Sequence, residues 1–364
     1  PYSAGQDWDF YSGTSMSSPH IAGLGALLTD AHPNWTPAMM KSALMTTATT
    51  LTNQGNTIPG GPFAYGAGHV VPNSAVDPGL VYNAGFLDWF GFLCGTGQLN
   101  SPSCPFLEID PSDLNYPSIA IGELAGEQTV MRTVTNVGVA GTYHVSVDAP
   151  FGVDVVVSPT SLTLASGESA SYSVTFTTNG SATIGAYTNG SLTWSHGPHS
   201  VTSPLVVRPV QLAAPTELAS DGTDNSLSFD VTFGYNGDYA AAAHGLEPAT
   251  TQDGNVVDDP DNDINIALGT GVGVTAHLVY APPGSAFTRI SLFDDYTDGD
   301  DDLDLYVWEY PSFNYVGGSG SGTSAEEVNV LFPASEYYYV IVHGWQTDGP
   351  DANYTLFDWS VSAT

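Results

Sequence analysis

Ser15 is the residue of this sequence whose surroundings best suit nucleophilic chemistry. It lies in the run GTSMSSPH (13–20), where small residues let a substrate approach and the apolar sequence that follows predicts a helix beginning here. An N–H group at the start of a helix can donate to an oxyanion, and the helix dipole favours negative charge there. Ser15 is therefore a candidate nucleophile whose own backbone N–H would stabilise the oxyanion. The alternative is that Ser15 only caps the helix.

Other titratable residues near Ser15 are weaker candidates for its general base. His20 lies five residues further along the predicted helix, more than one turn below the exposed end, so we expect it to pack rather than to take a proton. Asp7 and Asp9 precede the motif and are expected to be surface or loop residues. The 14 residues before Ser15 contain no histidine.

Two helices are predicted around this motif. Residues 12–31 are apolar or small on almost every side until Asp30, a pattern typical of a buried helix. A second helix is expected to begin after Thr36, which is a suitable N-cap, with Pro37 at the first helical position. The buried first helix would hold Ser15 at its amino end.

Acidic side chains could supply a calcium site further along the chain. The run DGDDDLD (298–304) offers carboxylates at alternate positions from Asp298, Asp300, Asp302 and Asp304, and Ca²⁺ prefers such oxygen ligands. An EF-hand is rejected because Leu303 stands where that loop needs glycine. A loop calcium site and a merely solvated acidic loop both remain open. The serine chemistry itself requires no cofactor.

The two cysteines of the chain, Cys94 and Cys104, lie close together in a segment rich in glycine and proline. A disulfide between them would stabilise the fold by roughly 2–3 kcal/mol. The alternative, two unrelated thiols, stays open because sequence does not give geometry. We favour the disulfide, and with it an oxidising, extracellular location.

The charge balance excludes whole classes of partner. Four basic residues stand against 38 acidic ones, for a formal net charge of −34. Nucleic-acid binding needs lysine and arginine to neutralise phosphates, and four basic residues are too few for that role. We expect no membrane span, because no stretch approaches about 18 unbroken apolar residues. Of the 38 acidic residues, 25 lie in 215–364, which suggests a separate C-terminal domain.

Short runs rich in valine, threonine and tyrosine occupy residues 112–210, separated by glycine, proline and asparagine, as in a β-sandwich. Residues 213–222 then resemble a linker into another β-rich unit that ends near Thr364. We therefore expect three domains, over residues 1–111, 112–212 and 213–364.

Several motifs together resemble one protein family. GTSMSSPHIAGLGALL closely resembles the nucleophile motif of the subtilases, and the later runs AHPNWTPAMMKSALMTTA and YGAGHVVPNSAVDPGLVY resemble the sequence that follows it in the plant branch. MRTVTNVG and PFGVDVVVSPTSLTLASGESASYSVTF resemble the fibronectin type III-like domain of that branch. The resemblance covers roughly residues 10–210. It implies the C-terminal piece of an α/β subtilisin-like catalytic domain, followed by two β-sandwich domains.

The resemblance implies a secreted serine endopeptidase that hydrolyses polypeptides through an acyl-enzyme at Ser15. In the family the triad aspartate and histidine and the oxyanion asparagine all precede the serine, so we expect them upstream of this chain. The chain alone is then expected to be inactive. In the family the motif histidine, here His20, is not the general base.

The last segment carries a weaker resemblance. DLDLYVW (302–308), YYYVIVHGW (337–345) and ANYTLFDWSV (352–361) resemble the pre-peptidase C-terminal type β-sandwich of bacterial secreted proteases. This implies an appendage that contacts a substrate or a surface. The runner-up for the whole chain is a non-catalytic extracellular binding or adhesion protein made of β-sandwiches.

Overall fold

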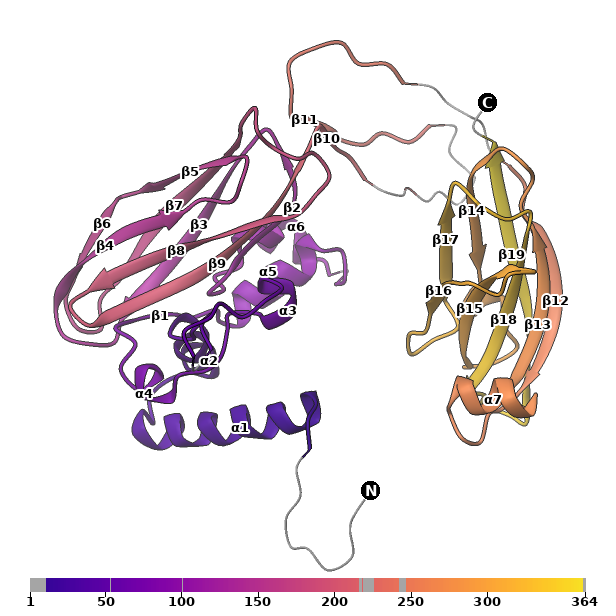
Figure 1. Cartoon of the computed structure of the whole chain (residues 1–364), viewed down its shortest axis with the longest axis horizontal. Coiled ribbons are helices and arrows are strands. Elements are labelled where there is room, and N and C mark those ends of the chain that lie inside the picture. Colours follow the sequence, from indigo (N-terminus) through magenta and orange to yellow (C-terminus); the bar gives the residue numbers. More distant parts are fainter. Residues whose placement is uncertain are drawn as a thin grey trace, which may run out of the picture. The chain divides into compact units, whose positions relative to one another are not determined.

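The structure is a computed structural model that describes residues 11–52, 54–99, 101–215, 218, 226–241 and 247–362. The chain divides into two compact units, Pro1–Asp238 and Tyr239–Thr364, here called the first and second units (Figure 1). Among the described residues, no helix has both the length and the hydrophobicity needed to cross a membrane.

The first unit begins with a helical part. Its helices are α1 (Thr14–Ala31), α2 (Pro37–Thr46), α3 (Pro62–Tyr65), α4 (Pro72–Ala75), α5 (Phe86–Gly95) and α6 (Cys104–Leu107), followed by the short 3₁₀ helix η1 (Pro111–Asp113). The predicted start of α2 is confirmed: the Thr36 hydroxyl accepts the N–H of Met39 at 3.1 Å, and Pro37 is the first helical residue.

A β-sandwich completes the first unit. One sheet has the order β1-β3-β7-β5 and the other the order β2-β9-β8-β4-β6. The strands are β1 (Leu80–Tyr82), β2 (Ile119–Ala125), β3 (Glu127–Asn136), β4 (Gly141–Asp148), β5 (Val153–Ser158), β6 (Ser161–Leu164), β7 (Ser169–Thr178), β8 (Thr188–His196) and β9 (His199–Val210). Alternate residues of both sheets form one buried core, which includes Trp194, Phe176 and Tyr143. The sandwich expected from residues 112–210 is therefore present.

Strand β1 ties the helical part to this sandwich. It pairs with β3, so Leu80 lies opposite Asn136 and Tyr82 opposite Val134. The N–H of Tyr82 also donates to the Ser42 hydroxyl of α2 at 2.9 Å. The sheet β1-β3-β7-β5 thus includes residues 80–82, well before position 112. The hydrogen bond between Tyr82 and Ser42 anchors α2 on this sheet.

The second unit is a further sandwich of two four-stranded sheets, with orders β12-β19-β14-β17 and β13-β18-β15-β16. Its elements are β12 (Thr250–Val257), α7 (Ile264–Thr270), β13 (Val274–Tyr280), β14 (Ser285–Ser291), η2 (Asp294–Tyr296), β15 (Asp302–Tyr310), β16 (Tyr315–Ser319), β17 (Glu327–Leu331), β18 (Tyr337–Gln346) and β19 (Asp351–Ser362). Side chains from both sheets share one core.

The boundary between the units differs from the one expected after residue 212. β10 (Leu212–Ala213) pairs with β11 (Thr232–Phe233), so this later segment still belongs to the first unit. The units divide between Asp238 and Tyr239. Pairing of two dipeptides twenty residues apart leaves no signal in composition, which is why the sequence placed the division earlier.

Candidate functional site: the amino end of helix α1

Ser15 lies in the first turn of α1, where the sequence predicted it. Gly13 precedes the helix with φ 146°, a conformation that favours glycine. Its carbonyl oxygen accepts the N–H groups of Met16 and Ser17 at 3.1 and 3.2 Å, which closes the first turn. Gly13 is therefore the N-cap, and Thr14 and Ser15 are the first two residues of the helix.

The backbone around Ser15 suits an oxyanion. Ser15 is the second helical residue, so its N–H has no acceptor within the helix. Its side chain is exposed. Pro19 lies inside the helix and has no N–H to donate to the carbonyl four residues earlier, which is that of Ser15. The Ser15 N–H can therefore donate to a ligand, and the partial positive charge of the helix end favours an anion there.

His20 does not act on Ser15 in this structure. Its Nδ1 lies 2.6 Å from the carbonyl oxygen of Met16, one turn back on the same helix, a distance that fits an Nδ1–H donor. This bond ties the ring to its own helix, and the expectation that His20 is not the general base stays a prediction. Its side chain is exposed rather than packed. Asp7 and Asp9 lie outside the described residues.

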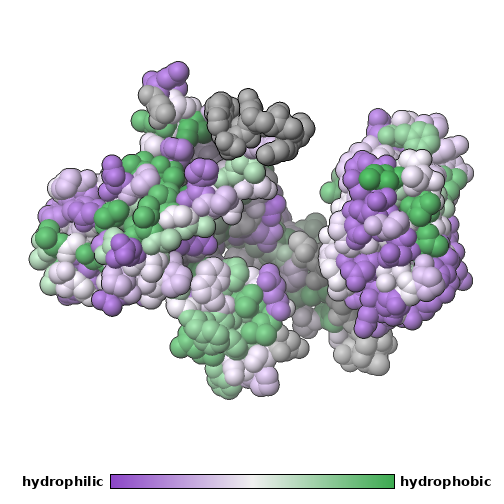
Figure 2. Space-filling view, turned by 90° about the horizontal axis from the view of Figure 1, so that it is seen from below, coloured by the Kyte–Doolittle hydropathy of each residue, from purple (hydrophilic) through white to green (hydrophobic). Residues whose placement is uncertain are grey.

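The expected burial of helix α1 is wrong for the described part of the chain. Only Leu28 is buried, whereas Leu27 is 67% and Ile21 42% exposed. Among the described elements, α2 packs against α1, and the Thr29 hydroxyl contacts the Met40 sulfur at 3.4 Å. Figure 2 views the molecule from the side on which α1 lies and shows hydrophobic residues at the surface there. A helix that is almost free of charged side chains can be buried, but the elements packed around it decide whether it is.

The four aspartates predicted to bind calcium take different roles in the second unit. Asp298 accepts the N–H and the side-chain amide of Asn353 at 2.8 and 2.6 Å. Asp300 accepts no hydrogen bond that the structure records, and its own N–H faces Asp348 at 3.4 Å. Asp302 begins β15, and Asp304 faces His343. Within the described ranges, no group of three or more histidine, cysteine, aspartate or glutamate side chains is placed to hold a metal ion. The calcium site remains a prediction without structural support.

A buried histidine that the sequence did not reveal lies beside Asp304. His343 Nε2 is 2.9 Å from Asp259 and its Nδ1 is 3.4 Å from Asp304, and all three side chains are almost fully buried. Burial lowers the pKa of His343, but the hydrogen bonds and charges of Asp304 and Asp259 outweigh it and raise that pKa. This cluster joins the loop before α7 to β15 and β18. The one available signal was a histidine within the apolar strand YVIVHGW.

The disulfide is present. Cys94, in α5, is bonded to Cys104, at the start of α6, with Cα atoms 5.3 Å apart. It fixes the loop between these two helices, and both cysteines predicted to pair do so. The open alternative of two free thiols is therefore excluded.

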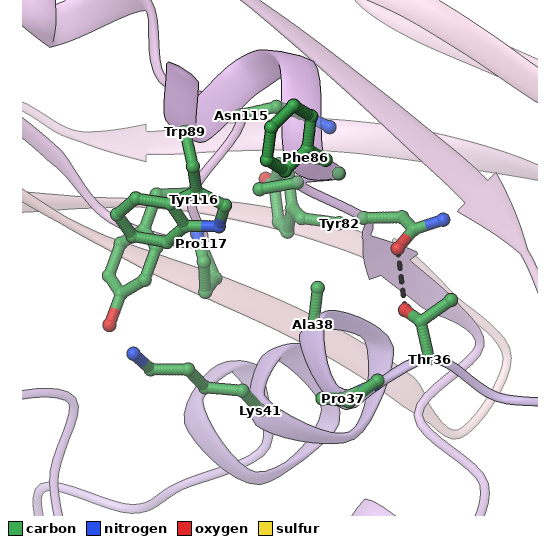
Figure 3. A pocket seen from close by; sticks show the side chains of 13 residues that line it. Thr36, Pro37, Ala38, Lys41, Tyr82, Phe86, Trp89, Asn115, Tyr116 and Pro117 are labelled. Atoms are coloured by element: carbon green, nitrogen blue, oxygen red, sulfur yellow. Dashed lines mark hydrogen bonds between the residues drawn. The ribbon is translucent and has the colours of Figure 1, made fainter. Parts of the chain in front are cut away.

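A pocket of about 480 Å³ opens between α2 and α5 (Figure 3). Its walls are mainly apolar, with Trp89 and Phe86 on one side and Ala38 on the other. Lys41 and Tyr116 also line the pocket, and the Lys41 ammonium lies over the Tyr116 ring, 4.7 Å from the ring centre. Ser15 does not line this pocket, so it is separate from the candidate nucleophile.

Comparisons with known proteins agree with the motifs. The model of the subtilase family matches residues 1–68, and the model of a fibronectin type-III domain matches residues 113–207. Subtilisin-like protease SBT1.7 of Arabidopsis thaliana is 42% identical over 221 residues, which make up 55% of this chain and 29% of that protein. Subtilisin-like protease Glyma18g48580 of Glycine max is 42% identical over 222 residues, 56% of this chain and 28% of that protein. The chain thus spans less than a third of the length of these relatives.

The two matched segments coincide with the two structural features described above. Residues 1–68 contain Ser15, α1 and α2, and residues 113–207 contain strands β2 to β8 and most of β9 of the first unit's sandwich. The second unit lies outside both matches. Residues 1–68 thus match the subtilase family, and residues 113–207 match a fibronectin type-III domain.

Proposed function

We propose that this chain carries the nucleophile of a serine endopeptidase that hydrolyses polypeptides. The observation that carries the proposal is the position of Ser15: an exposed hydroxyl in the first turn of α1, inside the segment that matches the subtilase family. The relatives named as subtilisin-like proteases support the same reaction class.

The chemistry is acyl transfer. The Ser15 oxygen attacks the peptide carbonyl carbon, a histidine accepts the serine proton, and an aspartate orients that histidine. The Ser15 N–H donates to the carbonyl oxygen as it becomes negative. The histidine returns the proton to the leaving amine, and water then hydrolyses the acyl-enzyme. By the chain order of the subtilases, the aspartate, the histidine and the oxyanion asparagine would be encoded ahead of Pro1.

We place the protein outside the cell. The Cys94–Cys104 disulfide favours an oxidising compartment, and the strongly acidic composition keeps a secreted protein soluble. The second unit would then be an appendage of the pre-peptidase C-terminal type that contacts a substrate or surface. A non-catalytic adhesion protein is the less favoured reading, because the nucleophile motif is complete.

A fluorophosphonate probe tests the proposal, applied to the protein produced with any coding sequence that precedes Pro1. We expect stoichiometric labelling that Ser15→Ala abolishes and that Ser18→Ala, an exposed serine one turn away, leaves unchanged. Labelling that survives Ser15→Ala would exclude Ser15 as the nucleophile. The 364-residue chain alone is expected to show no peptide turnover, and turnover abolished by Ser15→Ala would contradict that expectation.

A further inference from the structure

An aromatic surface covers one face of the second unit. In the sheet β13-β18-β15-β16, the core side chains are the alternate ones, such as Val307, Tyr338 and Val340, so their neighbours face outward. Aromatic residues are frequent at these outward positions and in the loop that joins β15 to β16, and six neighbouring ones form one surface. They are Trp308, Tyr310, Phe313, Tyr315, Tyr337 and Tyr339, here called the aromatic surface.

Strand register makes these side chains one continuous patch. Trp308 lies opposite both Tyr339 of β18 and Tyr315 of β16, and Tyr310 lies opposite Tyr337. Phe313 bridges the rows, with its ring centre 6.0 Å from that of Tyr310 and 5.8 Å from that of Tyr339. Trp308 and Tyr339 are half-buried and the other four side chains are exposed. A contiguous patch of this kind is a mark of an interaction site rather than of isolated surface hydrophobes.

Phe313 presents its ring to solvent from an unusual backbone conformation. It has φ 57°, a left-handed conformation that is costly for a bulky residue, yet its side chain is 57% exposed. Hydrogen bonds from the Phe313 N–H to the Glu309 carbonyl and from the Glu309 N–H to the Asn314 carbonyl hold the loop in place. The hairpin thus holds the Phe313 ring at the surface, as the segment after β17 holds the ring of Phe332, which has φ 47° and is 74% exposed.

The charge of the unit selects the kind of partner. Residues 239–364 contain 20 acidic residues and one basic residue, Arg289. Glu309 lies in the same hairpin as Phe313, and hydrogen bonds from Asn314 and Ser312 lower its pKa, so it stays ionised. Glu336 is exposed next to Tyr337. Anionic partners are repelled by this surface, and cationic ones are attracted.

The geometry of the aromatic rings also favours a cationic partner. Three pairs of rings within the aromatic surface are inclined steeply: 61° between Trp308 and Tyr315, 73° between Phe313 and Tyr339, and 80° between Tyr310 and Phe313. The flanking pairs Tyr306–Trp308 and Tyr280–Tyr337 are inclined by 33° and 44°. Flat stacking on a polysaccharide would need rings that lie in one plane. Inclined rings instead form corners in which a cation can face the π-electrons of two rings, an arrangement that suits guanidinium and ammonium groups.

We propose that the aromatic surface binds a protein segment rich in arginine and lysine. Its cations would lie against the faces of Phe313, Tyr315 and their neighbours, while Glu309 and Glu336 supply the opposite charge. This inference is independent of peptide hydrolysis at Ser15, because the surface lies wholly within the second unit.

The test measures binding of a fluorescent 12-residue peptide of alternating arginine and serine to the 364-residue chain, by anisotropy at low and at about 0.5 M salt. The double variant Phe313→Ser/Tyr315→Ser should bind roughly fivefold more weakly or worse, because two exposed cation–π contacts are lost. The control is Phe332→Ser, which removes an exposed ring from the end of β17. Thermal unfolding should show that both variants stay folded.

Weaker binding in the double variant, unchanged binding in Phe332→Ser, a fall in affinity with salt, and no binding of the matched glutamate–serine peptide would support the proposal. Equal affinity in the wild type and the double variant would overturn it, since the peptide would then be held by diffuse charge alone. Retention of the chain on insoluble chitin or cellulose without binding of the arginine peptide would overturn it in favour of a polysaccharide.

Discussion

The hydroxyl groups of Tyr82 and Tyr172 lie 2.6 Å apart in the core of the first unit. Tyr82 comes from β1, the short strand between α4 and α5, and Tyr172 comes from β7, within the segment that matches a fibronectin type-III domain. Tyr82 also lies 3.0 Å from the Ser203 hydroxyl of β9. Both rings are almost fully buried, so this pair fastens β1 to the sandwich core of the first unit.

Tyr82→Phe should destabilise the first unit by about 1–3 kcal/mol, because it leaves the buried Tyr172 hydroxyl without this partner. Burial raises the pKa of both tyrosines, which keeps the hydroxyls protonated and available as donors. Urea unfolding measures the effect. Tyr11→Phe is the control, because Tyr11 is exposed and its hydroxyl has no recorded partner in the described ranges. Equal midpoints for the two variants would show that the pair contributes little.

Local signals explain what the sequence predicted well. The amino ends of α1 and α2 depend on residues within one turn, Gly13 in one case and Thr36 with Pro37 in the other, so both could be located. Cys94 and Cys104 are ten residues apart, and their pairing also followed from proximity.

Long-range pairing explains what the sequence did not predict. The three residues of β1 gave no strand pattern of their own, and their strand exists because β3 supplies the partner. The contact between His343 and Asp259 joins residues 84 positions apart. The aromatic surface needed the register of three strands before its alternate tyrosines and tryptophan could be placed on one face. The exposure of α1 likewise depends on its neighbours and not on its composition.

The His343 cluster should make the second unit less stable as pH rises. The folded pKa of His343 is raised above its ordinary 6.5, so its contribution is complete below about pH 6.5 and is lost as pH rises through the folded pKa. Thermal unfolding between pH 6 and 9 should show this decline, and His343→Gln should flatten it. His144→Gln, at an exposed position of β4, is the control. A wild-type midpoint that is constant or rises over this range would contradict the assignment.

Removing the disulfide should weaken the first unit without touching the second. Cys94→Ala/Cys104→Ala frees the loop between α5 and α6, and the lost constraint on the unfolded chain is worth about 2–3 kcal/mol. Calorimetry resolves the two units if they unfold separately, and only the first transition should move. A reductant should shift the wild type in the same way and leave the double variant unchanged. A shift of the variant on adding reductant would show that the effect is not due to this bond.

Asp358 should be a source of instability at neutral pH. It faces the core side of β19, in line with Tyr354 and Leu356, and burial raises its pKa from 3.8 to about 6. The protonated form is therefore favoured by folding; its contribution is complete below pH 3.8 and is lost as pH rises through about 6. Asp358→Asn keeps the shape without the charge, so at pH 7.5 it should stabilise the second unit by about 1 kcal/mol after solvent screening. Below pH 3.8 the gain should vanish, and Asp295→Asn, at an exposed position, should give no gain at either pH. A gain of equal size at both pH values would mean that packing, and not the buried charge, limits stability at this end of the core.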